Sequence, residues 1–343
     1  VVSSLMASCG NNCPWGSIRA VGGSVIFSGD SSMPDLPVLL SADEFRIAEL
    51  PSSGTDGGTG PFQVTGQTNG TLSLAANESC WAGRPFADAV EIRARRSVND
   101  QWLDLSADRA DVVEVPAESI RLAQQQHLSL AISHPVEIVA LELTESGMLG
   151  NPNIRAAIAA AVDRNALANV IFQKQGVAAA ALLPQSVSGF AFLFPPDRDL
   201  NKAHELRGGI TPPSLSLAAD AGATWQLAAQ RIALNLREAG FTVQLAPAGA
   251  QRADLILRTF RLPSADAGAD LAVILRAAGE ATAGIGSDPE SLYKEERGVL
   301  EQNVLIPLVH LPRAYAYGPG VRDFHLRSDG SPELASASLE ATP

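Results

Sequence analysis

The amino-acid sequence predicts an α/β fold with mixed sheets, made of a β-rich first part and an α/β second part. Two observations carry this prediction. Up to Pro116, polar and apolar residues alternate in short stretches separated by glycine-rich turns, which is typical of antiparallel strands. Residues 214–260 instead follow the order strand, helix, strand, strand, and a strand–helix–strand unit favours parallel pairing with a right-handed crossover.

In the first part, the clearest single element is a β-hairpin. Residues 62–77 alternate in short stretches around "TNGT", where an Asn-Gly pair suits a tight two-residue connection. Similar short runs predict strands at residues 24–29, 88–97 and 109–116, and a helix is expected to end near "PVLLSADEF". The loop "PSSGTDGGTGPF" lacks the Lys-Ser/Thr pair of a phosphate-binding loop, so we expect no nucleotide site there.

The second part begins with a predicted strand at residues 135–143, followed by a pair of helices at 151–172. Asp163 stands where the apolar stripe of the first helix ends. A carboxylate at this position can accept backbone N–H bonds from the first turn of the next helix. We expect Arg155 and Arg164 to form ion pairs, so this segment is interpreted as structural and not as ligand-contacting.

The next helix is predicted at residues 223–241. It carries the apolar residues Leu227, Ile232, Leu234 and Leu236 and ends in Gly240, the residue best able to take the left-handed C-terminal conformation.

A last helix is predicted at residues 288–303. It leads into a pair of strands at 304–321, which Pro307 and Pro312 are expected to break. The tail after Asp329 is polar and small, and we expect it to lie along the surface or fray.

Composition excludes several classes of function. The 343-residue chain has a net charge of -12, whereas a nucleic-acid-binding surface needs clustered Lys and Arg. The single tight basic cluster, at Arg93, Arg95 and Arg96, is interpreted as a solvated strand face in preference to an anion site. No window holds the roughly 20 continuous apolar residues of a membrane-spanning helix. We therefore expect neither nucleic acid as a partner nor a span across the membrane.

Residues that carry metal or catalytic chemistry show no recognisable spacing. The histidines form no HxH or HExxH pattern and no nucleophile elbow is present, so we expect no metal, no cofactor and no enzyme activity. Cys9 and Cys13 flank the turn sequence "GNN", and a disulfide between them is a hypothesis for an oxidising compartment. Cys80 would then be unpaired.

Several separated motifs occur in an order that resembles one family. They are "GTGPF", "NESCWAGRPFADAVEIRA", "NPNIRAAIAAAVDRNALANVIFQKQGVAAAALLP", "AAQRIALNLREAGFTVQL" and "SLYKEERGVLEQNVLIPLVHLPRAYAYGPGVRDF". In this order they resemble the family-5 extracellular solute-binding proteins, the peptide and nickel receptors of ABC importers. Members usually carry a further N-terminal part before these motifs, so we expect this sequence to be either a fragment or a divergent relative.

The resemblance implies a two-lobed fold like that of periplasmic binding proteins of type II, cluster C. Lobe I would hold residues 1–116 and 303–343, and lobe II would hold 117–302, with a hinge near Pro116 and Asn303. The lobes would close over a small solute such as a peptide, and the closed form would dock on ABC permease subunits. The resemblance also implies a periplasmic or extracellular location, with a lipid anchor on an N-terminal signal.

The ligand-binding residues implied by the resemblance are Phe260, Arg261 and Asp266. Peptide-binding members show a Trp and then an Asp that pairs with the ligand's amino group. Here Phe260 stands near the Trp position and Asp266 is a displaced counterpart of the Asp, so recognition of a free peptide N-terminus is open. A surface-loop interpretation of these residues is equally open. Trp81 is expected to pack beneath its lobe.

Two alternatives to peptide transport remain open from the sequence. A nickel-chelate receptor needs no metal ligands of its own when the metal arrives inside a carrier. A chain that has this fold but serves as a structural or interaction subunit, without transport, is favoured by the altered anchor segment around Phe260.

Overall fold

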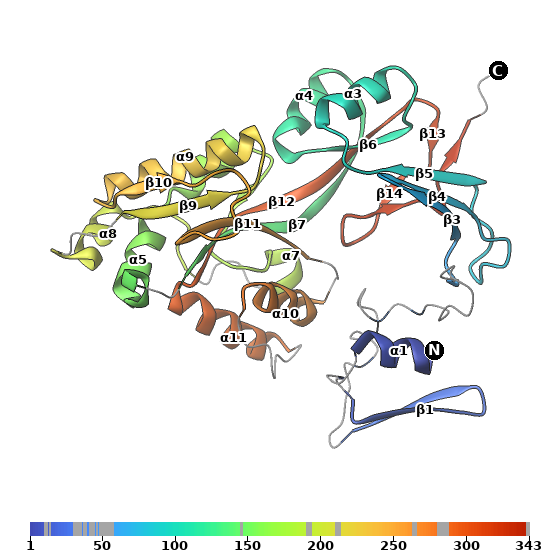
Figure 1. Cartoon of the computed structure of the whole chain (residues 1–343), viewed down its shortest axis with the longest axis horizontal. Coiled ribbons are helices and arrows are strands. Elements are labelled where there is room, and N and C mark those ends of the chain that lie inside the picture. The colour runs from blue at the N-terminus through green and yellow to red at the C-terminus, as the bar shows by residue number, and fades with distance from the viewer. Residues whose placement is uncertain are drawn as a thin grey trace. The chain divides into compact units, whose positions relative to one another are not determined.

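The computed structural model divides into two compact units, and Figure 1 labels most of their helices and strands. The first unit comprises Val1–Glu114, Tyr315–Arg327 and Ser331–Pro343. The second comprises Val115–Ala314 and Ser328–Gly330. The structure describes residues 1–9, 13, 15–29, 36, 40, 45, 47, 58–144, 147–189, 194–209, 214–262, 266–279 and 288–340.

The first unit is built from short helices and small antiparallel sheets. Its described elements are α1 (Val2–Cys9), β1 (Ser17–Val21), β2 (Ser24–Ser28), β3 (Phe62–Thr68), β4 (Thr71–Ala76), β5 (Ala89–Arg93), α3 (Val98–Ser106), β13 (Val321–Arg322), β14 (His325–Leu326), β15 (Pro332–Glu333) and β16 (Ser338–Leu339). Strands β3, β4 and β5 form a three-stranded antiparallel sheet, and β1 pairs with β2.

The hairpin predicted around Asn69 and Gly70 is confirmed. Thr68 and Thr71 are register partners across β3 and β4, so the Asn-Gly pair forms a two-residue connection. Gly70 has a φ of +91°, a conformation that glycine adopts without steric cost.

Helix α3 has no counterpart among the predicted elements. Its N-terminal signal is nevertheless in the sequence, because Ser97 caps the helix by accepting a hydrogen bond from the backbone N–H of Asp100 at 3.1 Å. Asp104 on this helix forms ion pairs with Arg96 and Arg109. Hydrogen bonds from these two guanidinium groups, that of Arg109 first, hold the pKa of Asp104 below its ordinary value.

Cysteine pairing in the first unit agrees with the predicted bridge. Cys13 is disulfide-bonded, and Cys80 is a free thiol. The predicted partner, Cys9, lies outside the residues whose side chains the structure describes. The helix end predicted near "PVLLSADEF" also falls mostly outside the described residues.

The second unit begins within strand β6, where the chain leaves the first unit. The elements from that point are β6 (Val112–Val115), α4 (Ile120–Gln125), β7 (Ser129–Leu143), α5 (Pro152–Ala161), α6 (Arg164–Ala166), a π-helical turn (Leu167–Ile171), β8 (Val177–Ala178), α7 (Gln185–Ser188), α8 (Leu200–Arg207), β9 (Leu215–Ala219), α9 (Ala223–Glu238), β10 (Val243–Leu245), β11 (Leu255–Arg261), α10 (Ala267–Ala277), α11 (Pro289–Gln302) and β12 (Leu305–Tyr317). Two 3-10 turns, Ala117–Ser119 and Gly147–Gly150, lie between them.

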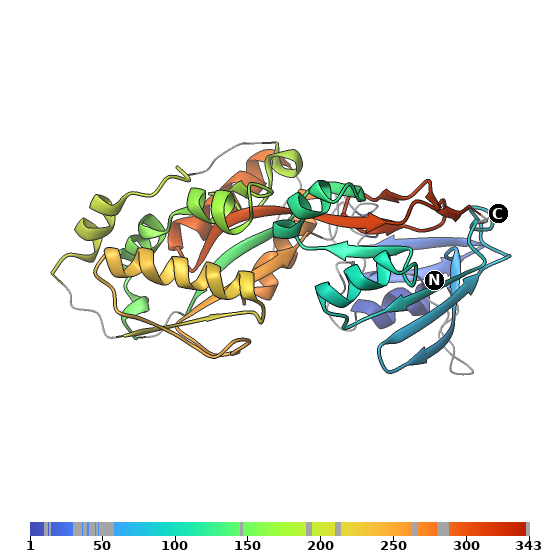
Figure 2. The same ribbon diagram turned by 90° about the horizontal axis from the view of Figure 1, so that it is seen from above.

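A seven-stranded mixed sheet organises this part of the chain. Its order is β10-β9-β11-β7-β12-β6, with β8 paired to β12. Strands β10 and β11 both run parallel to β9, whereas β11 runs antiparallel to β7. The predicted strand–helix–strand unit and the mixed sheet are therefore confirmed. Figures 1 and 2 both show α9 lying along β9 and β10.

Strand β7 is buried on both faces. Four successive residues, Ile138 to Leu141, are at most 1% exposed, and successive side chains of a strand point to opposite faces. On one face, Ile138 and Ala140 pack in a core cluster with Phe260 of β11 and with residues of α10 and α11. Burial on both sides makes β7 a rigid support for whatever its ends carry.

The contact-based units differ from the predicted lobes in three segments: residues 115–116, 303–314 and 328–330 group with the second unit, whereas the predicted division assigns them to the first lobe. In the longest of these, β12 pairs with β8 and packs against the core of the second unit. The hinge near Pro116 and Asn303 stays a prediction.

The predicted break at Pro307 and Pro312 is wrong, because β12 runs without interruption from Leu305 to Tyr317. Strand β8 pairs with β12 at Val309 and His310, between the two prolines, so neither proline removes a hydrogen bond from the pairing with β8.

Of the two predictions for the tail after Asp329, fraying is wrong, since β15 pairs with β14 and β16 pairs with β13. On α9, Ile232 and Leu236 are buried, whereas Leu227 and Leu234 are exposed. Gly240 has the predicted left-handed conformation, with a φ of +83°.

The "VDR" segment after α5 caps two helix ends. Asp163 accepts a hydrogen bond from the N–H of Ala166 at 2.8 Å, which confirms the predicted cap of α6. Arg164 donates to the carbonyl oxygens of Pro307 at 2.8 Å and Ala159 at 3.1 Å, and Arg198 donates to that of Ala161. The last turn of α5 leaves carbonyl groups without helical partners, and these arginines satisfy two of them.

Arg155 and Arg164, for which we predicted ion pairs, both donate hydrogen bonds to carbonyl oxygens. Arg155 donates to Gln302 at the C-terminal end of α11, at 2.7 Å, and to Leu149, at 2.8 Å. The hydrogen bonds of Arg164 to described residues go to carbonyls and not to the ion pair that we expected. Burial lowers the pKa of Arg164 to about 10, so this cap is made at a desolvation cost.

Glu296 and His310 are buried and hold the segment from Ala179 to Leu183. Oε1 of Glu296 accepts from the N–H groups of Leu182 at 2.5 Å and Leu183 at 3.0 Å, and Nε2 of His310 lies 3.1 Å from the carbonyl oxygen of Leu182. Burial raises the pKa of Glu296 to about 7, and burial lowers the pKa of His310 to about 4.

These two shifts affect stability in opposite directions. Folded Glu296 keeps its proton up to about pH 7, whereas in the unfolded chain the carboxyl loses it above 4.5, so its contribution falls as the pH rises between these values. Folded His310 stays neutral down to about pH 4, whereas unfolded it takes up a proton below 6.5, so its contribution falls as the pH drops. The two slopes therefore oppose each other between pH 4.5 and 6.5.

The cap of α6 gives a first prediction. Asp163→Ala should lower the free energy of unfolding by about 1 kcal/mol, because the first turn of α6 loses its acceptor. Asp163→Asn keeps an acceptor oxygen and should cost less. Urea unfolding of both variants measures the difference, and equal losses would contradict the capping role.

The buried pair gives a second prediction. Relative to wild type, Glu296→Gln should gain about 3 kcal/mol of stability as the pH rises from 4.5 to 7, because it removes a carboxylate that is disfavoured when folded. His310→Gln should gain a similar amount as the pH falls from 6.5 to 4. Urea unfolding at several pH values tests this, and difference curves independent of pH would refute it.

Candidate ligand site on the second unit

The three predicted ligand residues lie at or after the end of strand β11. Phe260 is 6% exposed and packs into the core with α10 and α11, so it supports the strand from within. Arg261 is the last residue of β11, and 43% of its side chain is exposed. Asp266 caps α10, accepting a hydrogen bond from the N–H of Ala269 at 2.7 Å. Whether a solute contacts any of them stays a prediction.

Arg261 belongs to a line of charges that crosses three neighbouring strands. It is the register partner of Glu137 on β7, so the two side chains lie on the same face of the sheet. Oε1 of Glu137 in turn lies 3.6 Å from Nε of Arg313 on β12. We call Arg261, Glu137, Arg313 and Asp329 the charged row.

Asp329 completes the charged row from a turn outside the sheet. Its Oδ2 lies 3.2 Å from Nη2 of Arg261. The following residue, Gly330, has a φ of +73° and fits tightly, because a Cβ there would come within 2.8 Å of a methyl carbon of Val136. It would also come within 3.4 Å of Cβ of Arg313. Glycine at this position lets the turn approach β7 and β12 closely.

The charged row suits a small polar solute. It presents two guanidinium groups and two carboxylates beside the C-terminal end of β11, and the exposed fractions of the side chains are 43% for Arg261, 25% for Glu137, 17% for Asp329 and 15% for Arg313. Partly buried charges interact more strongly than exposed ones because water screens them less. Arg261 is the member most accessible to a solute.

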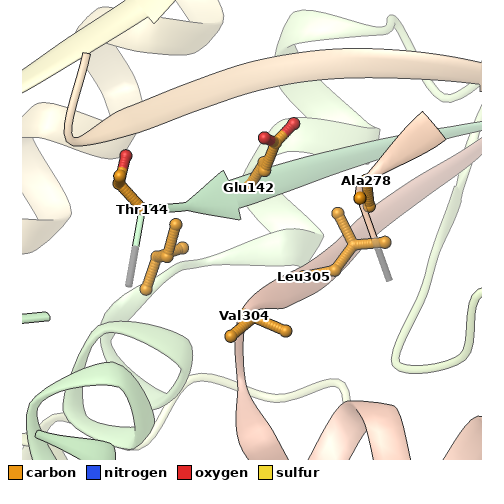
Figure 3. A pocket seen from close by; sticks show the side chains of 7 residues that line it. Glu142, Thr144, Ala278, Val304 and Leu305 are labelled. Carbon is orange, nitrogen blue, oxygen red and sulfur yellow. The ribbon is translucent and has the colours of Figure 1, made fainter. Parts of the chain in front are cut away.

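A separate pocket lies toward the other end of β7 (Figure 3). Its volume is about 250 Å³, and its lining residues are Glu142, Leu143, Thr144, Ala278, Gly279, Val304 and Leu305. Oε2 of Glu142 lies 2.7 Å from Nε of Arg258; burial raises the pKa of Glu142, while Arg258 lowers it. Glu142 stands five positions after Glu137 along β7, which corresponds to about 17 Å in a strand. The pocket is therefore distinct from the charged row, and it is smaller than the roughly 300–1,000 Å³ of typical ligand pockets.

In the first unit, Asn77 joins the motif "GTGPF" to the motif that begins at "NESCW". Its side-chain amide donates to the carbonyl oxygen of Gly60 at 2.8 Å, and its N–H donates to that of Pro61 at 2.8 Å. Asn77 therefore braces the Gly58–Pro61 turn. The expectation that Trp81 packs beneath the lobe is wrong, because this residue is 85% exposed. The turn after Asn77 directs the indole outward and not toward the sheet.

The sequence alone does not identify Glu137, Arg313 or Asp329. Arg313 and Asp329 lie more than 170 residues from Glu137, and nothing local indicates that they meet. The one available signal is a charged residue at the end of an otherwise apolar strand, as in "PVEIVALEL" and "LILRTFR", where a carboxylate and a guanidinium begin or end buried runs.

The paired questions of a metal site and of a membrane-spanning helix concern other functions. No group of three His, Cys, Asp or Glu side chains in this part of the chain is arranged to hold a metal ion. Within the same residues we find no helix with the length and apolar character that crossing a membrane requires.

Comparison with known proteins identifies a family. Residues 50–280 match the family model for the bacterial extracellular solute-binding proteins, family 5, middle part. Heme-binding protein A of Haemophilus influenzae is 25% identical over 134 residues, which cover 38% of this chain and 24% of that protein. The chain aligns with only 19–26% of the length of the curated relatives it matches.

Solved structures share the fold. NikA from Staphylococcus aureus, in complex with Ni(L-His)2, has a TM-score of 0.83 at 16% identity, over 96% of this chain and 81% of NikA. The dipeptide binding protein from Pseudoalteromonas sp. SM9913, in complex with Met-Leu, has a TM-score of 0.77 at 17% identity, over 98% of this chain and 78% of that protein. They confirm the predicted α/β fold class with mixed sheets, like that of periplasmic binding proteins.

The charged row gives a third prediction. Glu137→Gln should lower the free energy of unfolding by about 1–2 kcal/mol, because two guanidinium groups would then face each other across a neutral side chain. Glu301→Gln removes the carboxylate partner of Arg297 from an exposed pair on α11 and should cost less, because water screens both groups. Urea unfolding compares the two, and equal costs would mean that the row contributes no more than a surface ion pair.

Proposed function

The chain belongs to the bacterial extracellular solute-binding proteins, family 5, and from that premise we propose that it is the solute-binding receptor of an ABC importer. The solute is a peptide or a similar small polar molecule. The family match over residues 50–280 carries this proposal. The family consists of binding proteins, and we propose that this chain binds its solute without converting it.

The proposed mechanism is closure of two lobes over the solute. Closure requires contacts that the solute makes in the closed state and not in the open one. Arg261 is the best placed of the three predicted residues to make such a contact, since nearly half of its side chain is exposed. In this proposal Phe260 supports the strand that presents Arg261, and Asp266 stands at the N-terminus of α10, on the chain that follows.

The proposed partners and location follow from the family. The closed receptor would dock on ABC permease subunits, in the periplasm or outside the cell. The finer expectation, that a lipid on an N-terminal signal holds the receptor at the membrane, belongs to the same proposal.

A second candidate function is a structural or interaction subunit without transport. One observation favours it: Phe260 is buried in the core and Asp266 already caps a helix, so two of the three predicted ligand residues have structural roles. Such a subunit would bind no small solute.

A thermal-shift panel gives a fourth prediction and separates the two candidates. The panel holds Met-Leu, a nickel–histidine complex and heme, whose classes are those named for the relatives and solved structures. A receptor should show a rise of about 5 °C in the unfolding midpoint with one class at about 100 times its Kd, because a ligand of the folded state stabilises by mass action. Glu301→Gln should shift equally. No shift with any class would favour the interaction subunit.

A further inference from the structure

Arg261 has an internal carboxylate in contact with its guanidinium group. Oδ2 of Asp329 lies 3.2 Å from Nη2 of Arg261, and the Arg261 side chain is 43% exposed against 17% for Asp329. We propose that Arg261 is the anion-recognising residue of the solute site, and that Asp329 occupies its guanidinium group until a carboxylate of the solute displaces it. This inference rests on the proposed receptor function.

The contact with Asp329 is weak enough to be exchanged. Ion pairs with a half-exposed partner contribute little, and water reaches the guanidinium group of Arg261, which is 43% exposed. A guanidinium group has five N–H donors in a planar fork that matches a carboxylate with two parallel hydrogen bonds. The contact from the described Asp329 uses Nη2, so a solute carboxylate that engages the fork makes the better pair.

Asp329 is held in place for this role by its neighbour. Gly330 lies so close to Val136, Ser133 and Arg313 that no other residue fits its conformation without displacing them. The turn is therefore fixed against β7 and β12, so the backbone of Asp329 keeps its place when the guanidinium group of Arg261 exchanges this carboxylate for that of a solute. Asp329 then remains close enough to compete with the solute for Arg261.

The other guanidinium group of the charged row is a poorer acceptor for a solute. The Arg313 side chain is 15% exposed, and Glu137 lies beside it at 3.6 Å. The backbone N–H of Arg313 also donates to Oγ of Ser133 at 2.9 Å. Glu137 is itself the register partner of Arg261, so it keeps a negative charge beside both arginines. This arrangement favours a solute that carries one carboxylate over one that carries several.

The test is a titration of two matched probes by calorimetry. The probes are Met-Leu and Met-Leu amide, which differ in the C-terminal carboxylate. Asp329→Asn removes the competing charge and should tighten Met-Leu binding about five-fold, while changing the Kd of the amide less than about two-fold. Arg261→Gln should remove the preference of wild type for Met-Leu over its amide. Glu301→Gln, which frees the similarly exposed Arg297 on α11, should leave both Kd values unchanged.

The outcomes distinguish this inference from the receptor proposal. If Met-Leu and its amide bind equally well in wild type, or if Asp329→Asn changes both Kd values by the same factor, the inference is overturned while the receptor proposal stands. A purely structural role of Asp329 would give that second pattern. If neither probe binds to any variant, the inference and the assignment to peptides fall together.

Discussion

The second unit depends on buried carbonyl oxygens at helix ends being satisfied by arginine. Arg155 reaches the end of α11, and Arg164 and Arg198 reach the last turn of α5. Arg164 also donates to Pro307, which joins this corner to β12. A guanidinium group in such surroundings loses hydration, as the lowered pKa of Arg164 reflects. Without these arginines the carbonyl oxygens would lose their donors, and each buried oxygen left unsatisfied would cost about 1–3 kcal/mol.

This constraint links the motif around Asp163 to the candidate site. Arg155 joins α5 to the end of α11, and Arg164 joins the same corner to β12 at Pro307. Further along, β7 and β12 carry Glu137 and Arg313, with Arg261 of β11 beside them. A charged row on a rigid sheet is pre-organised, and a solute does not have to order it on binding.

Local patterns predict part of this structure well. The Asn69-Gly70 hairpin, the Asp163 cap, Gly240 and the parallel strand–helix–strand unit all depend on neighbouring residues, so the sequence shows them directly. The motif order also identifies the family. The start of helix α3 is signalled in the sequence, because Ser97 and Asp100 stand at capping positions. The helix itself was not predicted, because it lacks a clear apolar stripe.

The remaining features depend on partners far away in the chain. Pro307 stands outside the part of β12 that pairs with β8, and Arg164 donates to a carbonyl oxygen 143 residues away instead of to a carboxylate. The contact of Asp329 with Arg261 spans 68 residues. No period or spacing signals such meetings. The central claim, that the chain is a solute receptor, is tested by native mass spectrometry of protein purified without a step that removes bound solute. A receptor should retain one small molecule per chain, which is released on unfolding. A chain that carries no such molecule, even after incubation with a peptide mixture, would contradict the claim.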